Sequence, residues 1–149
     1  MLNSIYENSY FTNVILVFDT ETTSNDLKYG KPRLIELAWH LYDDSGELIE
    51  LSSFLIIPKD FTIPEESIKI HGITNDRANH YGVDKEQVLN LFLKAVEKSK
   101  ILVGHNLDFD IRIISRELNI LQRDWTAGKK LVCTMMEASK LIISTNINL

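Results

Sequence analysis

The 149-residue sequence has few of the residues that mark secreted or membrane proteins. Its single cysteine, Cys133, excludes a disulfide within one chain. No apolar run approaches the roughly 18 residues that a membrane-spanning helix needs. Internal repeats, low-complexity tracts and linkers are also missing, so nothing divides the chain into several domains. With 44% hydrophobic and 25% charged residues, the composition is typical of one globular domain.

Basic residues are absent from the start of the chain, since the first one is Lys28. A secretory signal begins with positive charge, and Glu7 has the opposite sign, so we expect a cytoplasmic protein. The net charge of −5 argues against a protein whose main task is to coat nucleic acid. Residues 1–76 carry 13 acidic and 5 basic side chains (net −8), and residues 77–149 carry 8 and 11 (net +3). This division fits a metal-dependent enzyme that acts on a polyanion, and it fits ordinary surface variation equally well.

Hydrophobic patterning predicts an α/β fold. Strands are expected at 14–19, 33–42, 47–57, 101–104 and 130–134, and helices at 64–81 (in short pieces), 84–99, 107–121 and 135–143. A turn at 43–46 joins the second and third strands into an antiparallel hairpin, and the other strands are expected to be parallel. The first strand is continuously apolar, which is typical of a strand covered on both faces.

Several local details follow from the same pattern. Thr74 or Asn75 is expected to cap a short helix, and Asp84 with Gln87 to begin the helix at 84–99. Cys133 is interpreted as a buried strand residue. Two core faces are predicted: Ile35, Leu37, Trp39 and Leu41 on the second strand, and Val88, Leu91, Phe92, Ala95 and Val96 on the helix.

Two carboxylates follow the first strand in the segment VFDTETT, residues 17–23. Side chains alternate along a strand, so Asp19 and Glu21 share one face and Thr20 takes the other. Sites in open α/β sheets lie at the carboxyl ends of strands, where the segment GHNLDFD, residues 104–110, also begins. Carboxylates from both segments could hold Mg²⁺ or Mn²⁺, and a pair of such ions promotes in-line attack on a phosphodiester. Alternatively, Asp19 and Glu21 end a strand and face solvent.

Three segments together resemble the four-carboxylate (DEDD) superfamily of 3′–5′ exonucleases. They are VFDTETT at 17–23, HGIT at 71–74 and GHNLDFDIRII at 104–114, and they are most similar to the epsilon, or proofreading, subunit of bacterial DNA polymerase III. The resemblance implies an RNase H-like fold, in which helices flank a five-stranded mixed sheet. It also implies two Mg²⁺ or Mn²⁺ ions and release of nucleoside 5′-monophosphates from a 3′ end.

The resemblance also implies roles for particular residues. Asp19, Glu21 and Asp110 match the catalytic and metal-binding carboxylates. Asp110 is preferred to Asp108 because an aromatic residue, Phe109, directly precedes it, and Asp108 is expected to pair with Arg112. The implied substrate-binding residues are Thr20, Thr22, His71, His105 and Asn106. A structural role for His71 and a capping role for Asn106 are the alternatives.

The family's third motif is missing from the sequence. That motif supplies a fourth carboxylate and a general base, either histidine or tyrosine, but the last histidine is His105 and the last tyrosine is Tyr81. We therefore expect residues 1–149 to form a single exonuclease-like domain, truncated before the final catalytic helix and impaired in activity. One alternative is a non-catalytic module that binds nucleic acid or protein. Another is a site completed by a second chain, by Glu137 or by Asp124.

The expected partners follow from the same resemblance. A single-stranded DNA 3′ end is the favoured substrate, with RNA as the alternative, and a DNA polymerase is a candidate protein partner. No membrane association is expected. Apolar surface left uncovered by the missing C-terminal helix predicts self-association.

Overall fold

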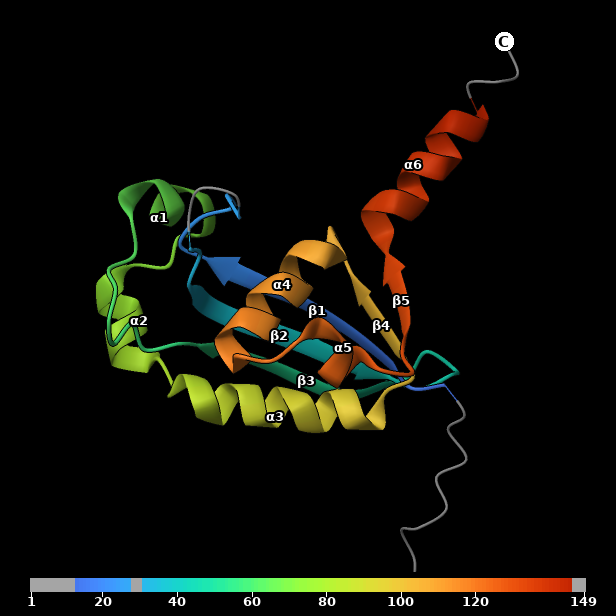
Figure 1. Ribbon diagram of the computed structural model, residues 1–149, viewed down its shortest axis with the longest axis horizontal. Coiled ribbons are helices and arrows are strands. Elements are labelled where there is room, and N and C mark those ends of the chain that lie inside the picture. The colour runs from blue at the N-terminus through green and yellow to red at the C-terminus, as the bar shows by residue number, and fades with distance from the viewer. Residues whose placement is uncertain (1–12, 28–30, 146–149) are drawn as a thin grey trace, which may run out of the picture.

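The computed structural model describes residues 13–27 and 31–145, and in these ranges five strands form one mixed sheet (Figure 1). The strands are β1 (Ile15–Thr22), β2 (Leu34–Tyr42), β3 (Leu48–Leu55), β4 (Ile101–Gly104) and β5 (Lys130–Cys133). Their order across the sheet is β3-β2-β1-β4-β5. β1, β2 and β3 pair in antiparallel fashion, whereas β1, β4 and β5 are parallel. The predicted hairpin beside parallel strands is thus confirmed.

The hairpin follows its sequence pattern closely. Each of the predicted core residues of β2 is at most 2% exposed: Ile35, Leu37, Trp39 and Leu41. The turn is held by Asp43, whose Oδ1 accepts the backbone N–H groups of Ser45 and Glu47, both over 2.9 Å. Gly46 follows with φ of 89°, a conformation that glycine adopts without strain. The strand that leaves the turn ends before Pro58, as predicted.

The helices in the described residues are α1 (Glu65–His71), α2 (Asn75–Tyr81), α3 (Lys85–Lys98), α4 (Leu107–Leu118), α5 (Gln122–Thr126) and α6 (Thr134–Thr145). Thr74, not Asn75, caps α2, because its hydroxyl accepts the Arg77 N–H over 3.1 Å. The helix predicted at 107–121 is too long, since the chain leaves it at Asn119 in a left-handed conformation. None of these helices is long and apolar enough to cross a bilayer.

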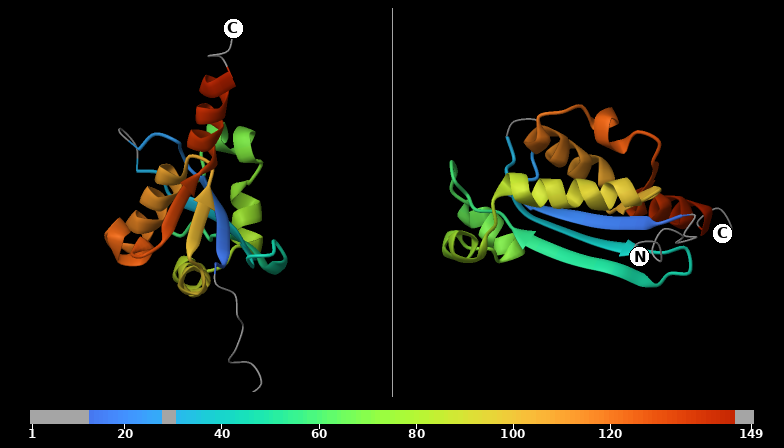
Figure 2. Two further views of the ribbon diagram at one scale, coloured as in Figure 1. Left: turned by 90° about the vertical axis from the view of Figure 1, so that its right-hand side faces the viewer. Right: turned by 90° about the horizontal axis from the view of Figure 1, so that it is seen from below.

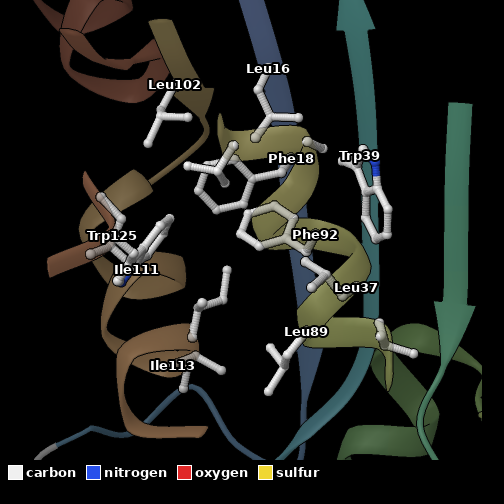
Figure 3. Packing of buried hydrophobic residues seen from close by; sticks show 14 of the residues in the cluster. Leu16, Phe18, Leu37, Trp39, Leu89, Phe92, Leu102, Ile111, Ile113 and Trp125 are labelled. Carbon is white, nitrogen blue, oxygen red and sulfur yellow. The ribbon is translucent and has the colours of Figure 1, made fainter. Parts of the chain in front are cut away.

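The main core lies between the sheet and the helices α3, α4 and α5, which cover one face (Figures 1 and 2). Phe92 of α3 is central to it and meets Phe18 edge-to-face, with 5.2 Å between the ring centroids (Figure 3). One predicted core residue of α3 is wrong: Leu91 is 38% exposed, and Leu89 is buried in its place. The face of α3 that packs against the sheet therefore includes Leu89 and not Leu91.

The described residues leave the opposite face of the sheet open. Val17, in the middle of the central strand, is 37% exposed, and Leu51 of β3 is 62% exposed. The prediction that β1 is covered on both faces is therefore wrong, because α3, α4 and α5 all pack on the other side. Cys133 is half-buried, not buried as predicted.

Candidate active site

The central strand continues beyond the end of its parallel neighbour. Pairing of β1 with β4 ends at Val17 and Val103, but β1 runs on to Thr22 while paired with β2 alone. The strand predicted at 14–19 therefore extends to residue 22. Past β4 the chain turns at Gly104, where an added Cβ would lie 2.9 Å from the Leu107 side chain. This tight turn brings the start of α4 against the free edge of β1.

The first contact across this edge joins Thr20 to Asp110. The Thr20 backbone N–H and hydroxyl both donate to Oδ1 of Asp110, over 3.2 and 2.5 Å. Asp110 is 2% exposed and lies in the first turn of α4, where the helix dipole favours negative charge. Burial nevertheless raises the pKa of Asp110 to about 6, and the charge of Asp19 contributes, while the Thr20 hydrogen bonds act against the shift.

Asp19 and Glu21 lie on the other face of β1, as their spacing predicts. Partial burial raises the pKa of both carboxyls. For Asp19, the charge of Glu36 raises the pKa further, whereas the Thr20 N–H and the charge of His105 lower it. For Glu21, the charges of Asp19 and Glu36 both raise the pKa further. In the described ranges, no ion pair joins a basic side chain to Asp19, Glu21 or Asp110.

Glu36 is a fourth carboxylate of this region that the sequence analysis missed. It lies directly opposite Glu21 in the β1–β2 register, and its Oε1 accepts the Ser53 hydroxyl over 2.6 Å. The alternation of β2 already places Glu36 on the face away from the core. Its neighbour across the sheet, however, depends on the register, which the sequence does not reveal.

These carboxylates are coupled by charge but do not form a ready-made metal cage. Among the residues that the structure describes, no three His, Cys, Asp or Glu side chains lie close enough together to hold a metal ion. The reason is geometric, because Asp110 is bound to Thr20 on the covered face, whereas Asp19 and Glu21 lie on the open one. The donor chemistry still fits a hard divalent cation, since unpaired carboxylates that repel one another gain from a shared positive charge.

A cavity of about 420 Å³ opens beside the end of β1, between this strand and α1. Four residues predicted from the family resemblance or the carboxylate pattern line it: Thr20, Glu21, Thr22 and His71. Its other lining residues carry no motif that would reveal in the sequence that they line a cavity, and they include Ser24, Glu66, Ser67, Ile70 and Phe109. Ser67 connects the two sides, because its hydroxyl donates to the Thr23 carbonyl over 2.7 Å.

His71 presents an unused hydrogen-bond donor near this cavity. Its Nδ1 accepts the Ile73 N–H over 3.0 Å, so the hydrogen of the neutral ring lies on Nε2. Nε2 is buried and has no partner in the described part of the chain. Burial lowers the pKa of His71, against the charge of Glu36, and thus favours this neutral form.

His105 and Asn106 lie apart from His71. A second cavity, of about 520 Å³ on the open face, is lined by Asp19 and His105, among others. The His105 Nδ1 lies 3.0 Å from the Thr134 hydroxyl. Asn106 occupies the N-cap position of α4 with φ of 61°, but its side chain makes no capping hydrogen bond, so that alternative is wrong. Asn tolerates this left-handed conformation better than most residues do.

The other acidic candidates are engaged elsewhere. Asp108 pairs with Arg112 over 2.8 Å, as expected. Glu137 pairs with Lys140 over 2.7 Å on α6. Asp124 accepts the Leu121 N–H over 3.0 Å at the start of α5. Neither Glu137 nor Asp124 joins the carboxylates of β1 into a metal-holding group in the described structure.

Comparison with known proteins relates the chain to nucleases. Residues 16–144 match the model of an exonuclease family, RNase_T. The DNA polymerase III subunit epsilon of Treponema pallidum is 32% identical over 123 residues, which are 80% of this chain and 51% of that protein. The epsilon subunit of Rickettsia prowazekii is 30% identical over 116 residues, which are 72% of this chain and 45% of that protein. The chain thus spans about half the length of these curated relatives.

Solved structures agree on the fold. A product-bound exonuclease I superimposes with a TM-score of 0.78 at 17% identity, over 87% of this chain and 32% of that one. E. coli exonuclease I in complex with a dT13 oligonucleotide gives a TM-score of 0.72 at 18% identity, over 86% and 30%. The fold is therefore RNase H-like, as the resemblance implied. The family match covers most of the chain, and the chain belongs to the RNase_T exonucleases of the DEDD superfamily, with a sequence that resembles the epsilon subunit of DNA polymerase III.

Proposed function

We propose that this chain is a metal-dependent 3′–5′ exonuclease domain that hydrolyses the terminal phosphodiester of DNA to nucleoside 5′-monophosphates, and that it is impaired in this activity. The observation that supports this most is the contact of Thr20 with Asp110, which lies within the matched region and sets Asp110 beside the strand end that carries Asp19 and Glu21. The bacterial relatives are named as subunits of a DNA polymerase, which favours DNA over RNA, a polymerase as partner and the cytoplasm as location.

In this proposal Asp19 and Glu21 hold the metal, and Asp110 adds negative charge from the other side of β1. Bound Mg²⁺ or Mn²⁺, two ions in the complete family site, would activate water and neutralise charge on the phosphate. Thr20 keeps Asp110 in place through its two hydrogen bonds. Because burial raises the pKa of each carboxyl, protons compete with a metal ion for these groups.

The cavity beside β1 is the proposed pocket for the terminal nucleotide. Its volume of about 420 Å³ lies in the range of small-ligand sites. Ile70, 81% exposed, and Phe109 offer apolar surface on which a base can stack. The Nε2–H of His71 is suited to a sugar or phosphate oxygen. Thr22 lines the same cavity, whereas His105 and Asn106 would contact a neighbouring nucleotide.

Impaired activity is proposed because residues 115–149 contain no histidine or tyrosine that could serve as the third-motif base. A positioned general base contributes about 10²- to 10⁴-fold in rate. Residues 1–149 are proposed to form a single exonuclease-like domain. The alternative function is a non-catalytic module that binds nucleic acid or a protein, and the lack of a ready-made metal cage in the described residues favours it.

The test is degradation of a 5′-labelled single-stranded DNA with Mn²⁺, beside an RNA of the same sequence. We expect slow, stepwise shortening of the DNA from its 3′ end. Asp19→Asn should abolish it, whereas Asp108→Asn should retain it, because Asp108 pairs with Arg112 outside the site. Equal shortening by both variants would reveal a contaminating nuclease and overturn the proposal. DNA binding without shortening would support the alternative.

A further inference from the structure

A bulge separates the end of β1, which lines the cavity of about 420 Å³, from the rest of the strand. Glu21 of β1 pairs with Glu36 of β2. The next residue, Thr22, pairs with Leu34, so one residue of β2 is skipped. Such a bulge bends the strand and disrupts the ladder locally. The position of the residues beyond it therefore depends on contacts made at the start of β2.

The backbone of Arg33, which directly precedes β2, makes these contacts. Its carbonyl accepts the Thr23 N–H over 3.0 Å, and its N–H donates to the Thr23 hydroxyl over 2.9 Å. Thr23 lines the cavity, and its own carbonyl accepts the Ser67 hydroxyl of α1 over 2.7 Å. The backbone of Arg33 therefore holds the wall of the cavity that follows β1.

The side chain of Arg33 is anchored to the segment that leads into α1. Its Nη1 and Nη2 donate to the two carboxylate oxygens of Asp60, over 2.8 and 3.0 Å. Its guanidinium carbon also lies 4.7 Å from the centre of the Phe61 ring. A bidentate pair and a neighbouring ring together restrain the plane of the guanidinium. The chain then continues through Pro64 into α1, and both line the cavity.

The same side chain is anchored to α4. Its Nε donates to Oε1 of Glu117 over 3.3 Å, and the Leu34 N–H donates to the same oxygen over 3.1 Å. The Glu117 side chain is 5% exposed, so these hydrogen bonds are shielded from water. α4 also carries Phe109, which lines the cavity about two turns before Glu117. Arg33 thus contacts each of the three segments that supply the walls of the cavity.

We propose that Arg33 is a positioning residue, which sets the spacing of the three cavity walls and through it the affinity of the cavity for a nucleotide. This role rests on the proposed function, in which the cavity receives the terminal nucleotide. Arg33 is not among the described residues that line the cavity, so it acts through the segments that it holds. Lysine would not replace it fully, because one ammonium group lacks the planar set of N–H groups that reaches Asp60 and Glu117 together.

The test compares two affinities of the purified chain by calorimetry: that for Mn²⁺ and, at saturating Mn²⁺, that for thymidine 5′-monophosphate. Arg33→Met keeps an unbranched side chain but removes the guanidinium. It should weaken nucleotide binding about tenfold, since a site whose supporting contacts are lost becomes too loose for its ligand. Mn²⁺ affinity should change by less than about twofold, because the ion pairs of Arg33 do not include Asp19 or Glu21. A general loss of the fold would instead weaken both.

Asp60→Asn breaks the bidentate pair from the other side. The Asp60 side chain is 67% exposed and lies outside the described lining of the cavity, so this variant should stay folded and yet bind the nucleotide about threefold more weakly. Arg33→Lys should recover part of the affinity that Arg33→Met loses. The matched control is Lys59→Met, which removes the neighbouring ion pair with Asp84 and should bind the nucleotide as the unaltered chain does. Circular dichroism shows whether each variant is folded.

Equal nucleotide affinity of the unaltered chain, Arg33→Met and Asp60→Asn would overturn the role of Arg33 and leave the proposed function standing. A parallel loss of nucleotide and Mn²⁺ affinity in Asp60→Asn would also overturn it. If Arg33→Met does not fold, Asp60→Asn decides alone. If the unaltered chain does not bind the nucleotide, the cavity is not a nucleotide pocket, and the role of Arg33 fails together with that part of the proposed function.

Discussion

The hydroxyl of Thr20 donates a hydrogen bond to Oδ1 of Asp110 over 2.5 Å, although the two residues are 90 positions apart in the chain. The backbone N–H of Thr20 donates to the same oxygen. In a longer parallel ladder this edge of β1 would face another strand. Here the ladder ends at Val17 and Val103, and a helical carboxylate occupies the space. The hydrogen bonding of a strand edge thus positions a carboxyl group of the candidate site.

The raised pKa of Asp110 predicts a pH dependence of stability. The folded chain holds this proton up to about pH 6, whereas the carboxyl has an ordinary value of 3.8. Stability from this group is full below pH 3.8 and is lost as the pH rises through about 6. The loss is on the order of 3 kcal/mol. Urea unfolding measures the free energy of unfolding at pH 5 and at pH 8. This free energy should fall less between the two pH values for Asp110→Asn than for the unaltered chain. The same loss in Asp110→Asn would contradict the assignment, and Asp108→Asn is the control.

The Thr20 hydroxyl is expected to stabilise the fold when Asp110 is charged. Thr20→Val keeps the shape of the side chain but removes the donor, leaving the carboxylate with less compensation. We expect a loss of about 1–3 kcal/mol at pH 8 and a smaller loss at pH 4. Thr20→Ser retains the hydroxyl and should lose less at pH 8. Thermal melts at pH 4 and pH 8 measure the stability of each variant. An equal loss of stability for Thr20→Val and Thr20→Ser at pH 8 would exclude the hydrogen bond as the cause.

Divalent metal should stabilise the chain through Asp19 and Glu21. A ligand at 100 times its dissociation constant adds about 2.7 kcal/mol to the free energy of unfolding. The raised pKa values of both carboxyls mean that protons compete, so the increase in melting temperature should be larger at pH 8 than at pH 5. Mn²⁺ titrations of Asp19→Asn and Glu21→Gln should show little increase, while Glu137→Gln should behave as the unaltered chain. An equal response of all four proteins would show that the metal binds elsewhere.

Glu117 is predicted to anchor α4 to β2 and α3. Its side chain is 5% exposed and pairs with Lys85 over 2.7 Å and Arg33 over 3.3 Å. Burial alone would raise the pKa of Glu117. The pKa is instead lowered below 4.5, because Lys85 and the Leu34 N–H donate hydrogen bonds to the carboxylate and because Lys85 and Arg33 are positively charged. Its contribution is therefore present above pH 4.5 and is lost as the pH falls.

Glu117→Gln should cost about 1–3 kcal/mol at pH 7, because it removes a buried carboxylate from Lys85 and Arg33, of which Arg33 keeps its pair with Asp60. Denaturant unfolding measures the change. The control is Glu137→Gln, which removes one partner of an exposed pair and should change stability by less than about 1 kcal/mol. If the two variants differ little, the Glu117 pairs contribute no more than surface ion pairs.

Much of the fold follows from local pattern. The alternation of Ile35, Leu37, Trp39 and Leu41 predicted the covered face of β2, because strand periodicity and burial coincide there. The buried face of α3 was predicted less well. Leu89 and Leu91 both fit a wide apolar face of the helix, and packing against the sheet determines which of the two is buried. α5 has five residues, too few to show a helical period.

The site was predictable in part. Alternation alone placed Asp19 and Glu21 on one face. The contact of Thr20 with Asp110 and the position of Glu36 opposite Glu21 depend on strand order and register, which arise from packing across the whole sheet. Exposure of Val17 was not predictable either, since an apolar strand looks the same in sequence whether one or both of its faces are covered.

The parallel pairing of β1 with β4, which sets residue 15 beside residue 101, has a consequence for the order of folding. The hairpin closes through short loops, whereas this pairing must close a long one, so we expect it to form later. A nascent chain that ends before residue 110 carries Asp19 and Glu21 without Asp110. Metal affinity should therefore be complete only after β1 has paired with β4, and the candidate site would be among the last parts of the molecule to be assembled.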